Sequence, residues 1–242
     1  MTESTRREKL RADTEREILA CARRLLVEDG SHAVTLRAIA RELGITAPAL
    51  YRYYDSRADL LRHVCDDISA DLAATLNPQL SAIPISQPTE RVFAVCRGFR
   101  QWALAHPREF TLVFATSPEE TGTPANRPAQ DHFGRVFLEV AGPLLSEHKI
   151  YPSGSLDVPE RLRGELTAYR DDLAASLAAA GHQVAGEKLQ LGTIYLILQW
   201  WARMYGHVAL EVFGRFPFAV NDAEPLFESM LTELASVVGF SS

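Results

Sequence analysis

The residues best suited to chemistry lie together at positions 35–61, which read TLRAIARELGITAPALYRYYDSRADLL. Guanidinium, hydroxyl and phenol groups alternate there with small alanines. Arginine, threonine and tyrosine side chains can donate hydrogen bonds to phosphate oxygens or base edges, and alanine methyl groups can contact thymine methyls. This combination predicts contact with double-stranded DNA. The candidate DNA-contacting residues are Thr35, Arg37, Thr46, Ala47, Ala49, Tyr51, Tyr53 and Arg57.

Two short helices around a tight turn would position these groups. Thr35 can cap the first helix, and Gly44 supplies the permissive backbone that the turn needs. Thr46 can cap the second helix, and Pro48 fits its first turn. This pattern is typical of a helix-turn-helix, whose second helix enters the major groove. The side chains expected to face inward and fix the angle between the helices are Ile39, Ala40, Leu43, Ile45 and Leu50.

Helix pairs of this kind also occur in proteins that do not bind DNA. A helical small-molecule-binding or adaptor protein is therefore the alternative. An enzyme is not expected, because we recognise no nucleophile–base pair, metal-ligand cluster or glycine-rich phosphate loop. For the same reason we expect no metal site and no cofactor.

The composition is that of an ordinary globular protein, with 47% hydrophobic and 23% charged residues. The cysteines at 21, 65 and 96 lack CxxC spacing and are expected to be reduced thiols. No apolar run reaches the roughly 18 residues of a membrane span, and the polar N-terminus lacks the apolar core of a signal peptide. We therefore expect a cytoplasmic protein with no membrane partner.

Hydrophobic residues recur at helical spacing nearly throughout, and no alternating β-branched run predicts a strand. Thr14 with Glu17, and Ser56 with Asp59, match capping boxes and predict two helix starts. We predict an all-α fold: a three-helix helix-turn-helix DNA-binding domain at 1–56, then a larger helical bundle for ligand binding and dimerisation at 57–242. Later helices are expected at about 57–76, 89–105, 107–115, 129–148, 159–180, 186–213 and 223–238, with loops at 117–128 and 152–157.

The charge distribution fits this division. Residues 1–60 carry 11 Lys and Arg against 10 Asp and Glu, a net charge of +1. The remaining 182 residues carry 14 against 21, a net charge of −7. Residues 1–60 form a near-neutral, arginine-containing head, and the remaining residues form an acidic body. This distribution favours contact between the head and DNA phosphates, while the body is repelled from the duplex.

Aromatic residues are frequent in the second domain. Each could be ordinary core, but an apolar pocket with a few polar groups is the usual form of a small-molecule site. Arg100, His132 and Arg203 are further polar residues expected on inward faces. We expect an apolar or aromatic effector. The candidate ligand-binding residues are Phe93, Trp102, Phe110, Phe114, Phe133, Phe137, Tyr195 and Gln199.

The segment 189–213 is apolar on more than one face, so it should be buried on two sides. One side can face its own domain and the other a second copy of the chain. We therefore expect a homodimer whose interface uses this segment and the final helix. The residues of that helix expected at the interface are Leu226, Met230, Leu234 and Val238.

Residues 14–61 resemble the TetR family of repressors through the pattern T-x-R-x-I-A-x-x-L-G-I-T-x-x-A-L-Y-x-Y-Y-x-S-R-x-D-L-L. Arg57 departs from the lysine usual in the family, and Tyr53-Tyr54 from the common His-Phe. A second, weaker resemblance joins 102–114 and 201–211 to the effector domain of a Trp-His-Gly-type subgroup, from which Tyr205 departs. The resemblance implies a homodimer with two heads, a near-palindromic operator and a C-terminal effector domain.

Overall fold

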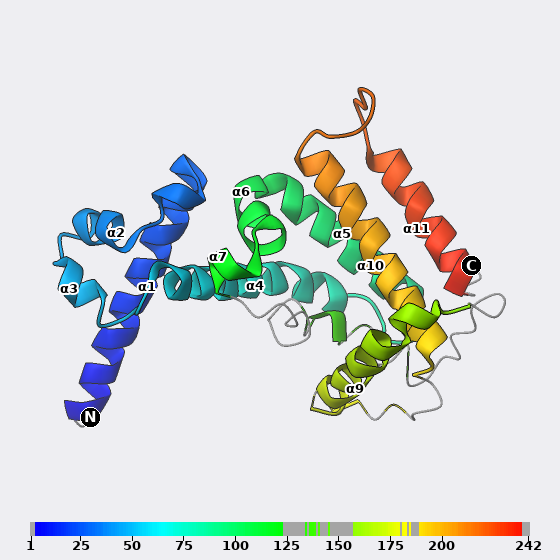
Figure 1. Ribbon diagram of the computed structural model, residues 1–242, viewed down its shortest axis with the longest axis horizontal. Coiled ribbons are helices and arrows are strands. Elements are labelled where there is room, and N and C mark those ends of the chain that lie inside the picture. The colour runs from blue at the N-terminus through cyan, green and yellow to red at the C-terminus, as the bar shows by residue number, and fades with distance from the viewer. Residues whose placement is uncertain are drawn as a thin grey trace. The chain divides into compact units, whose positions relative to one another are not determined.

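The computed structural model describes residues 3–122, 134, 136–138, 140, 145, 157–179, 181–182, 184 and 189–238 (Figure 1). Across these residues the chain forms helices and their connections without a strand, which confirms the predicted all-α fold. No helix in these ranges is long and apolar enough to cross a membrane. Contacts divide the chain into two compact units. The N-terminal unit is Met1–Asp71 with His106–Arg127, and the C-terminal unit is Leu72–Ala105 with Pro128–Ser242.

The N-terminal unit is built around the long first helix. Its core consists of fully buried side chains from successive helices, among them Ile18, Ile39, Leu50 and Leu61. Of the residues predicted to face inward, Ile39, Ala40 and Leu50 are buried, whereas Leu43 and Ile45 are half-buried. The elements are α1 (Glu3–Asp29), η1 (Ser31–Ala33), α2 (Leu36–Glu42), α3 (Ala47–Leu50), the first part of α4 (Arg57–Ser81), α6 (Pro107–Phe110), the π-helical turn η2 (Thr111–Ala115) and α7 (Pro118–Thr121).

One of the two predicted capping boxes is wrong. Helix α1 already begins at Glu3, and the Thr14 hydroxyl donates to the Leu10 carbonyl at 3.0 Å. A threonine inside a helix can satisfy its hydroxyl in this way, so the sequence pattern alone did not mark a helix start. The second predicted capping box, Ser56 with Asp59, does mark a helix start. The Asp59 N–H donates to Ser56 Oγ at 3.1 Å, and α4 begins at Arg57.

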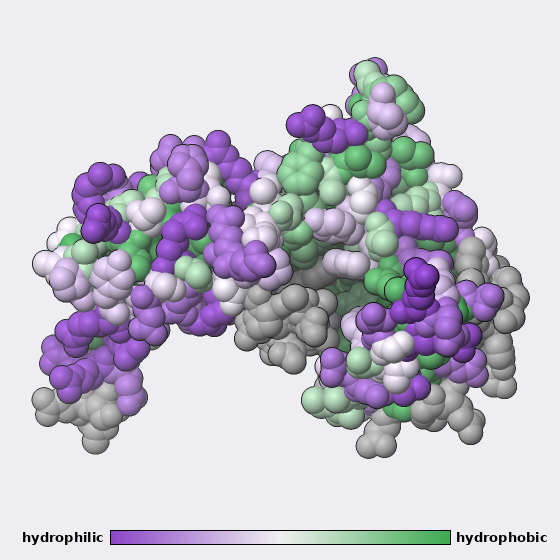
Figure 2. All heavy atoms as spheres, in the orientation of Figure 1, coloured by the Kyte–Doolittle hydropathy of each residue, from purple (hydrophilic) through white to green (hydrophobic). Residues whose placement is uncertain are grey.

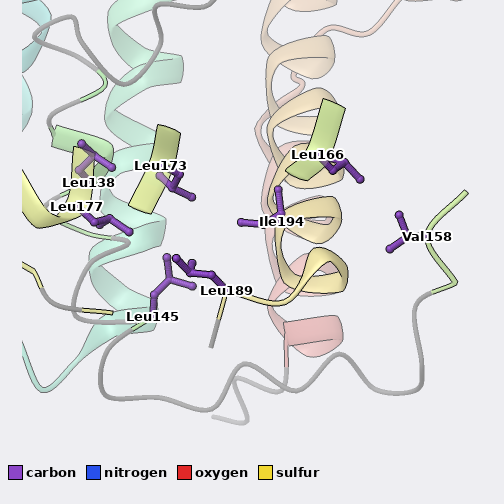
Figure 3. Close-up of a cluster of buried hydrophobic side chains, with 8 residues drawn as sticks. All are labelled: Leu138, Leu145, Val158, Leu166, Leu173, Leu177, Leu189 and Ile194. Atoms are coloured by element: carbon purple, nitrogen blue, oxygen red, sulfur yellow. The ribbon is translucent and has the colours of Figure 1, made fainter. Parts of the chain in front are cut away.

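The C-terminal unit is organised around α10 (Leu191–Val212), which contacts α5 (Pro88–Ala105), α9 (Arg163–Ala179) and α11 (Glu224–Val238). A short 3-10 turn, η3 (Glu160–Leu162), leads into α9. In Figure 3, Leu138, Leu173 and Leu177 lie close together within a larger buried cluster, to which α10 contributes Ile194. The whole cluster is Leu138, Leu145, Val158, Leu166, Leu173, Leu177, Leu189 and Ile194.

Helix boundaries differ from the predictions where packing or capping overrides local signals. Pro78 does not end α4, which continues to Ser81 with Leu76 and Leu80 buried on either side of the proline. Within the predicted loop at 117–128, Ser117 accepts from the Glu120 N–H and caps the short helix α7. The helix predicted at 129–148 falls largely outside the described residues.

Candidate nucleic-acid interface

The helix-turn-helix forms through local hydrogen bonds at both helix starts. Thr35 precedes α2 and its side chain accepts from the Ala38 N–H at 3.1 Å. Thr46 precedes α3 and accepts from the Ala49 N–H at 3.3 Å. Between them Gly44 adopts φ = 66°, a left-handed conformation that glycine reaches without strain. Each threonine hydroxyl keeps its hydrogen available for a second acceptor, such as a phosphate oxygen.

The second helix is short, but its hydrogen-bonded winding continues beyond its last regular residue. The Tyr51 N–H donates to the Ala47 carbonyl at 3.1 Å, and the Tyr54 N–H donates to the Leu50 carbonyl at 3.2 Å. Leu50 is fully buried and anchors this segment in the core. Residues 46–54 therefore form one continuous, largely helical segment, which we call the rod.

The outer side of this rod offers the predicted DNA-contacting groups. Tyr51 is 49% exposed, Thr46 is exposed, and Ala47 and Ala49 are half-buried. Arg37, at the start of α2, is also exposed. Arg52 is a second exposed cation beside Tyr51 that the sequence interpretation passed over, although its position next to that residue was a usable signal. Figure 2 shows a mainly hydrophilic surface on the visible face of this unit.

The remaining two tyrosines are held by packing. Tyr54 is 3% exposed and its ring lies edge-on to His63 at 5.1 Å, so it is part of the core of the N-terminal unit. Burial, followed by the charge of Glu15, raises the pKa of Tyr54 to about 12, so its phenol stays neutral. Tyr53 is half-buried beneath the Arg11 guanidinium, whose central carbon lies 5.7 Å from the ring centroid. Its predicted phosphate contact stays a prediction.

Arg57 occupies a different environment from the one expected of a phosphate-binding cation. Its Nε donates to the Val34 carbonyl at 3.0 Å and its Nη2 to the Ser31 carbonyl at 2.6 Å. Its Nη1 lies 3.5 Å from a carboxylate oxygen of Glu120 in α7. The guanidinium thus holds the connection between α1 and α2 against the start of α4. No sequence pattern signalled this, because the acceptors are backbone carbonyls more than twenty positions away.

A second cluster, also missed from the sequence, joins α1 to α4 and α6. Arg23 donates to Glu109 Oε1 at 3.0 and 2.7 Å, to Asp67 at 2.9 Å and to Asp71. Glu109 is only 3% exposed. Burial lowers the pKa of the Arg23 guanidinium, but the hydrogen bonds to these carboxylates outweigh burial and raise it, so the charge is permanent.

The candidate ligand-binding residues do not all gather in one compact unit. Phe110 and Phe114 belong to the N-terminal unit, where their rings lie 5.4 Å apart. Phe93, Trp102, Phe137, Tyr195 and Gln199 belong to the C-terminal unit, and Phe133 lies outside the described residues.

Two of the further polar residues expected on inward faces can be placed. Arg100 is mostly buried and pairs with Glu211, whereas Arg203 is exposed, so its predicted inward position is wrong. His132 lies outside the described residues.

Comparisons with known proteins agree over nearly the whole chain. The family described as bacterial regulatory proteins, tetR family, matches residues 18–64, and the Tetracyclin repressor-like, C-terminal domain matches residues 92–234, more than half of the chain. The chain is 27% identical to the HTH-type transcriptional regulators Rv1816 of Mycobacterium tuberculosis and Mb1846 of Mycobacterium bovis, over 96% of this chain and 95% of each relative. The crystal structure of the regulatory protein SCO4313 shares the fold with a TM-score of 0.62 at 22% identity, covering 95% of this chain and 98% of that one. The chain therefore belongs to the TetR family and is a helix-turn-helix transcriptional regulator.

Proposed function

We propose that the protein is a homodimeric repressor that binds a near-palindromic operator and releases it when a small apolar or aromatic effector binds. The observation that carries the proposal is the rod of residues 46–54, anchored by Leu50 and presenting Tyr51 at its surface. A helix of this width fits the major groove, where Tyr51, Thr46 and Arg37 supply donors for bases and phosphates. Membership of the family does not favour the adaptor alternative.

Exposed apolar residues on the last two helices support the dimer. Leu198 and Leu210 on α10 are 44% and 38% exposed, and Leu226 on α11 is 49% exposed. Leu234, also expected at the interface, is 2% exposed within the single chain, so it belongs to the protomer's own core. Two heads about 34–36 Å apart would enter successive major grooves, which gives the dimer its role in binding.

Release of the operator follows from a shift between two conformations of the dimer. Helix α4 belongs to both compact units, so a change in the effector unit can reach the head through it. Suppose that the ligand binds more tightly to a dimer whose two heads are spaced wrongly for DNA than to the dimer that fits DNA. The free energy of operator binding then becomes less favourable by the difference between these two ligand-binding free energies, typically about 1–3 kcal/mol. The resemblance of 102–114 and 201–211 to the Trp-His-Gly-type subgroup adds no ligand class to this proposal.

The test is DNA binding by wild-type protein and two variants, using fluorescence anisotropy. DNA is selected by the wild type from a random duplex pool and from the region upstream of its own gene. Tyr51→Ala should weaken binding about 10-fold or more, because one good base or phosphate contact contributes about 1–3 kcal/mol.

Phe218→Ala is the matched control. Phe218 is another exposed aromatic, 71% exposed, and lies in the C-terminal unit. The Phe218→Ala variant should bind the selected DNA with the affinity of the wild type. Both variants should keep the helical circular-dichroism spectrum of the wild type. Failure of the wild type to select any sequence, or equal affinity of Tyr51→Ala and wild type, would contradict the proposal.

A further inference from the structure

One face of α10 carries three polar side chains at seven-residue intervals: Thr193, Trp200 and His207. Thr193 and His207 are 4% and 8% exposed, and Leu196 and Met204, which flank Trp200 on this face, are also buried. Seven residues make nearly two helical turns, so the three side chains share one face at intervals of about 10 Å along the axis. We call this face the α10 stripe.

Two nitrogens of the α10 stripe are buried but make no hydrogen bond within the described part of the chain. They are Nε1 of Trp200 and Nε2 of His207. A carboxylate oxygen of Glu211 lies 3.8 Å from the His207 nitrogen, which is too far for a hydrogen bond. Folded proteins satisfy nearly all buried polar groups, because a buried donor without an acceptor is costly. An indole N–H can only donate, so its missing partner is an acceptor.

Two arginines of α5 near the α10 stripe already have carboxylate partners. Arg100 of α5 donates to both carboxylate oxygens of Glu211 at 2.8 and 2.7 Å, and Arg97 of α5 pairs likewise with Glu228 of α11 at 2.7 Å. Burial lowers the pKa of His207, so its imidazole is neutral at pH 7. A charged ligand would bring an unpaired charge into this environment, whereas a neutral acceptor would satisfy the indole without one.

We propose that the effector binds against α10 at Trp200 and is an uncharged, mostly apolar molecule whose oxygen accepts a hydrogen bond from Trp200 Nε1. This inference rests on the ligand-sensing half of the proposed function. It names a residue outside the aromatic set predicted from the sequence, and it specifies the chemistry that selects the ligand: a neutral carbonyl or ether oxygen on an apolar frame.

The test uses two probes of the same shape, 4-acetylbiphenyl and 4-ethylbiphenyl, which differ in one carbonyl oxygen. Dissociation constants are measured by isothermal titration calorimetry without DNA. The wild type should bind the ketone about tenfold more tightly than the hydrocarbon, the effect of one hydrogen bond. Trp200→Phe removes the N–H but keeps an aromatic ring, and should reduce this preference to about one.

Trp201→Phe is the matched control. The Trp201 ring lies 6.0 Å from Phe99 and 6.2 Å from Tyr205, as expected of a packing residue. Its variant should keep the tenfold preference. Without ligand, Trp200→Phe should lower the melting temperature by no more than Trp201→Phe does, because the Trp200 indole N–H makes no hydrogen bond that the substitution could remove.

Four results would overturn the inference: no saturable binding of the ketone, equal affinity of the wild type for both probes, a preference that survives in Trp200→Phe, or a larger loss of melting temperature in Trp200→Phe than in the control. Because DNA is absent, any of these can occur while operator binding is intact. In that case the ligand assignment fails and the DNA-binding half of the proposed function stands.

Discussion

Removing the Arg57 side chain should destabilise the DNA-binding head rather than remove a phosphate contact. Its two hydrogen bonds to the Ser31 and Val34 carbonyls come from a charged donor, and bonds of this type contribute about 1.5–3 kcal/mol each. The side chain is 34% exposed, so water replaces part of what is lost. The ion pair with Glu120 is longer and exposed, and adds less than about 1 kcal/mol. We expect Arg57→Ala to lower the free energy of unfolding by about 2–4 kcal/mol.

Two variants sharpen this prediction. Arg57→Lys keeps the charge but loses the planar fork that reaches two carbonyls at once, so it should lose about half as much stability, about 1–2 kcal/mol. Arg37→Ala removes an exposed cation and should change unfolding by less than about 0.5 kcal/mol. Unfolding is followed by circular dichroism in urea at one fixed protomer concentration, because dimers are stabilised by concentration. Hydrogen exchange at residues 31–34 reports whether the loss is local.

The salt dependence of operator binding separates the structural role from a phosphate contact. A cation that meets a phosphate contributes about 0.9 to the slope of log affinity against log salt, or about 1.8 for the two copies in a dimer. We expect the wild-type slope in Arg57→Ala and a reduced slope in Arg37→Ala. Unchanged stability in Arg57→Ala together with a slope lower by about 1.8 would refute the reasoning.

Three further predictions concern buried charge, pH and capping. Glu109→Gln should lower the free energy of unfolding by about 2 kcal/mol in urea titrations. This loss is smaller than for a fully buried ion pair, because Arg23 still pairs with other carboxylates in the variant. An unchanged free energy of unfolding would mean that the Arg23–Glu109 pair contributes nothing to stability. The pKa of His207 is lowered by folding, so the unfolded chain binds more protons, and melting temperature should fall as the pH drops below about 6.5. His207→Gln should flatten that decline, and an equally steep decline would contradict it. Thr46→Ala should cost about 1 kcal/mol through the lost cap, whereas Thr46→Ser should not, as thermal unfolding can show.

Sequence reasoning succeeded where structure is determined locally. The caps at Thr35 and Thr46 join atoms three residues apart, and the turn at Gly44 depends on a single φ angle, so spacing alone predicts them. Thr14 shows the limit of that logic. A helix that buries Ile18 and other residues of the same face extends through a cap pattern, because burial outweighs a local preference of about 1 kcal/mol.

Sequence reasoning missed residues whose role depends on distant parts of the chain. Glu109 is separated from Arg23 by 86 positions, and Trp200 became informative only once its indole nitrogen proved buried without an acceptor. The sequence shows how many charged and aromatic side chains the chain has. Only the fold determines which of these side chains contact one another.

This long-range pairing bears on what counts as the DNA-binding domain. The local motif ends near residue 56, yet Arg23 and Arg57, both within or next to it, find carboxylate partners in α6 and α7. Those short helices follow α5 in the chain but belong by contact to the N-terminal unit. Without residues 106–122, Arg23 would lose the buried Glu109 and Arg57 would lose Glu120. The helix-turn-helix is therefore specified by its own sequence, whereas two of the carboxylates that hold it in place come from residues 106–122, which follow α5 of the C-terminal unit.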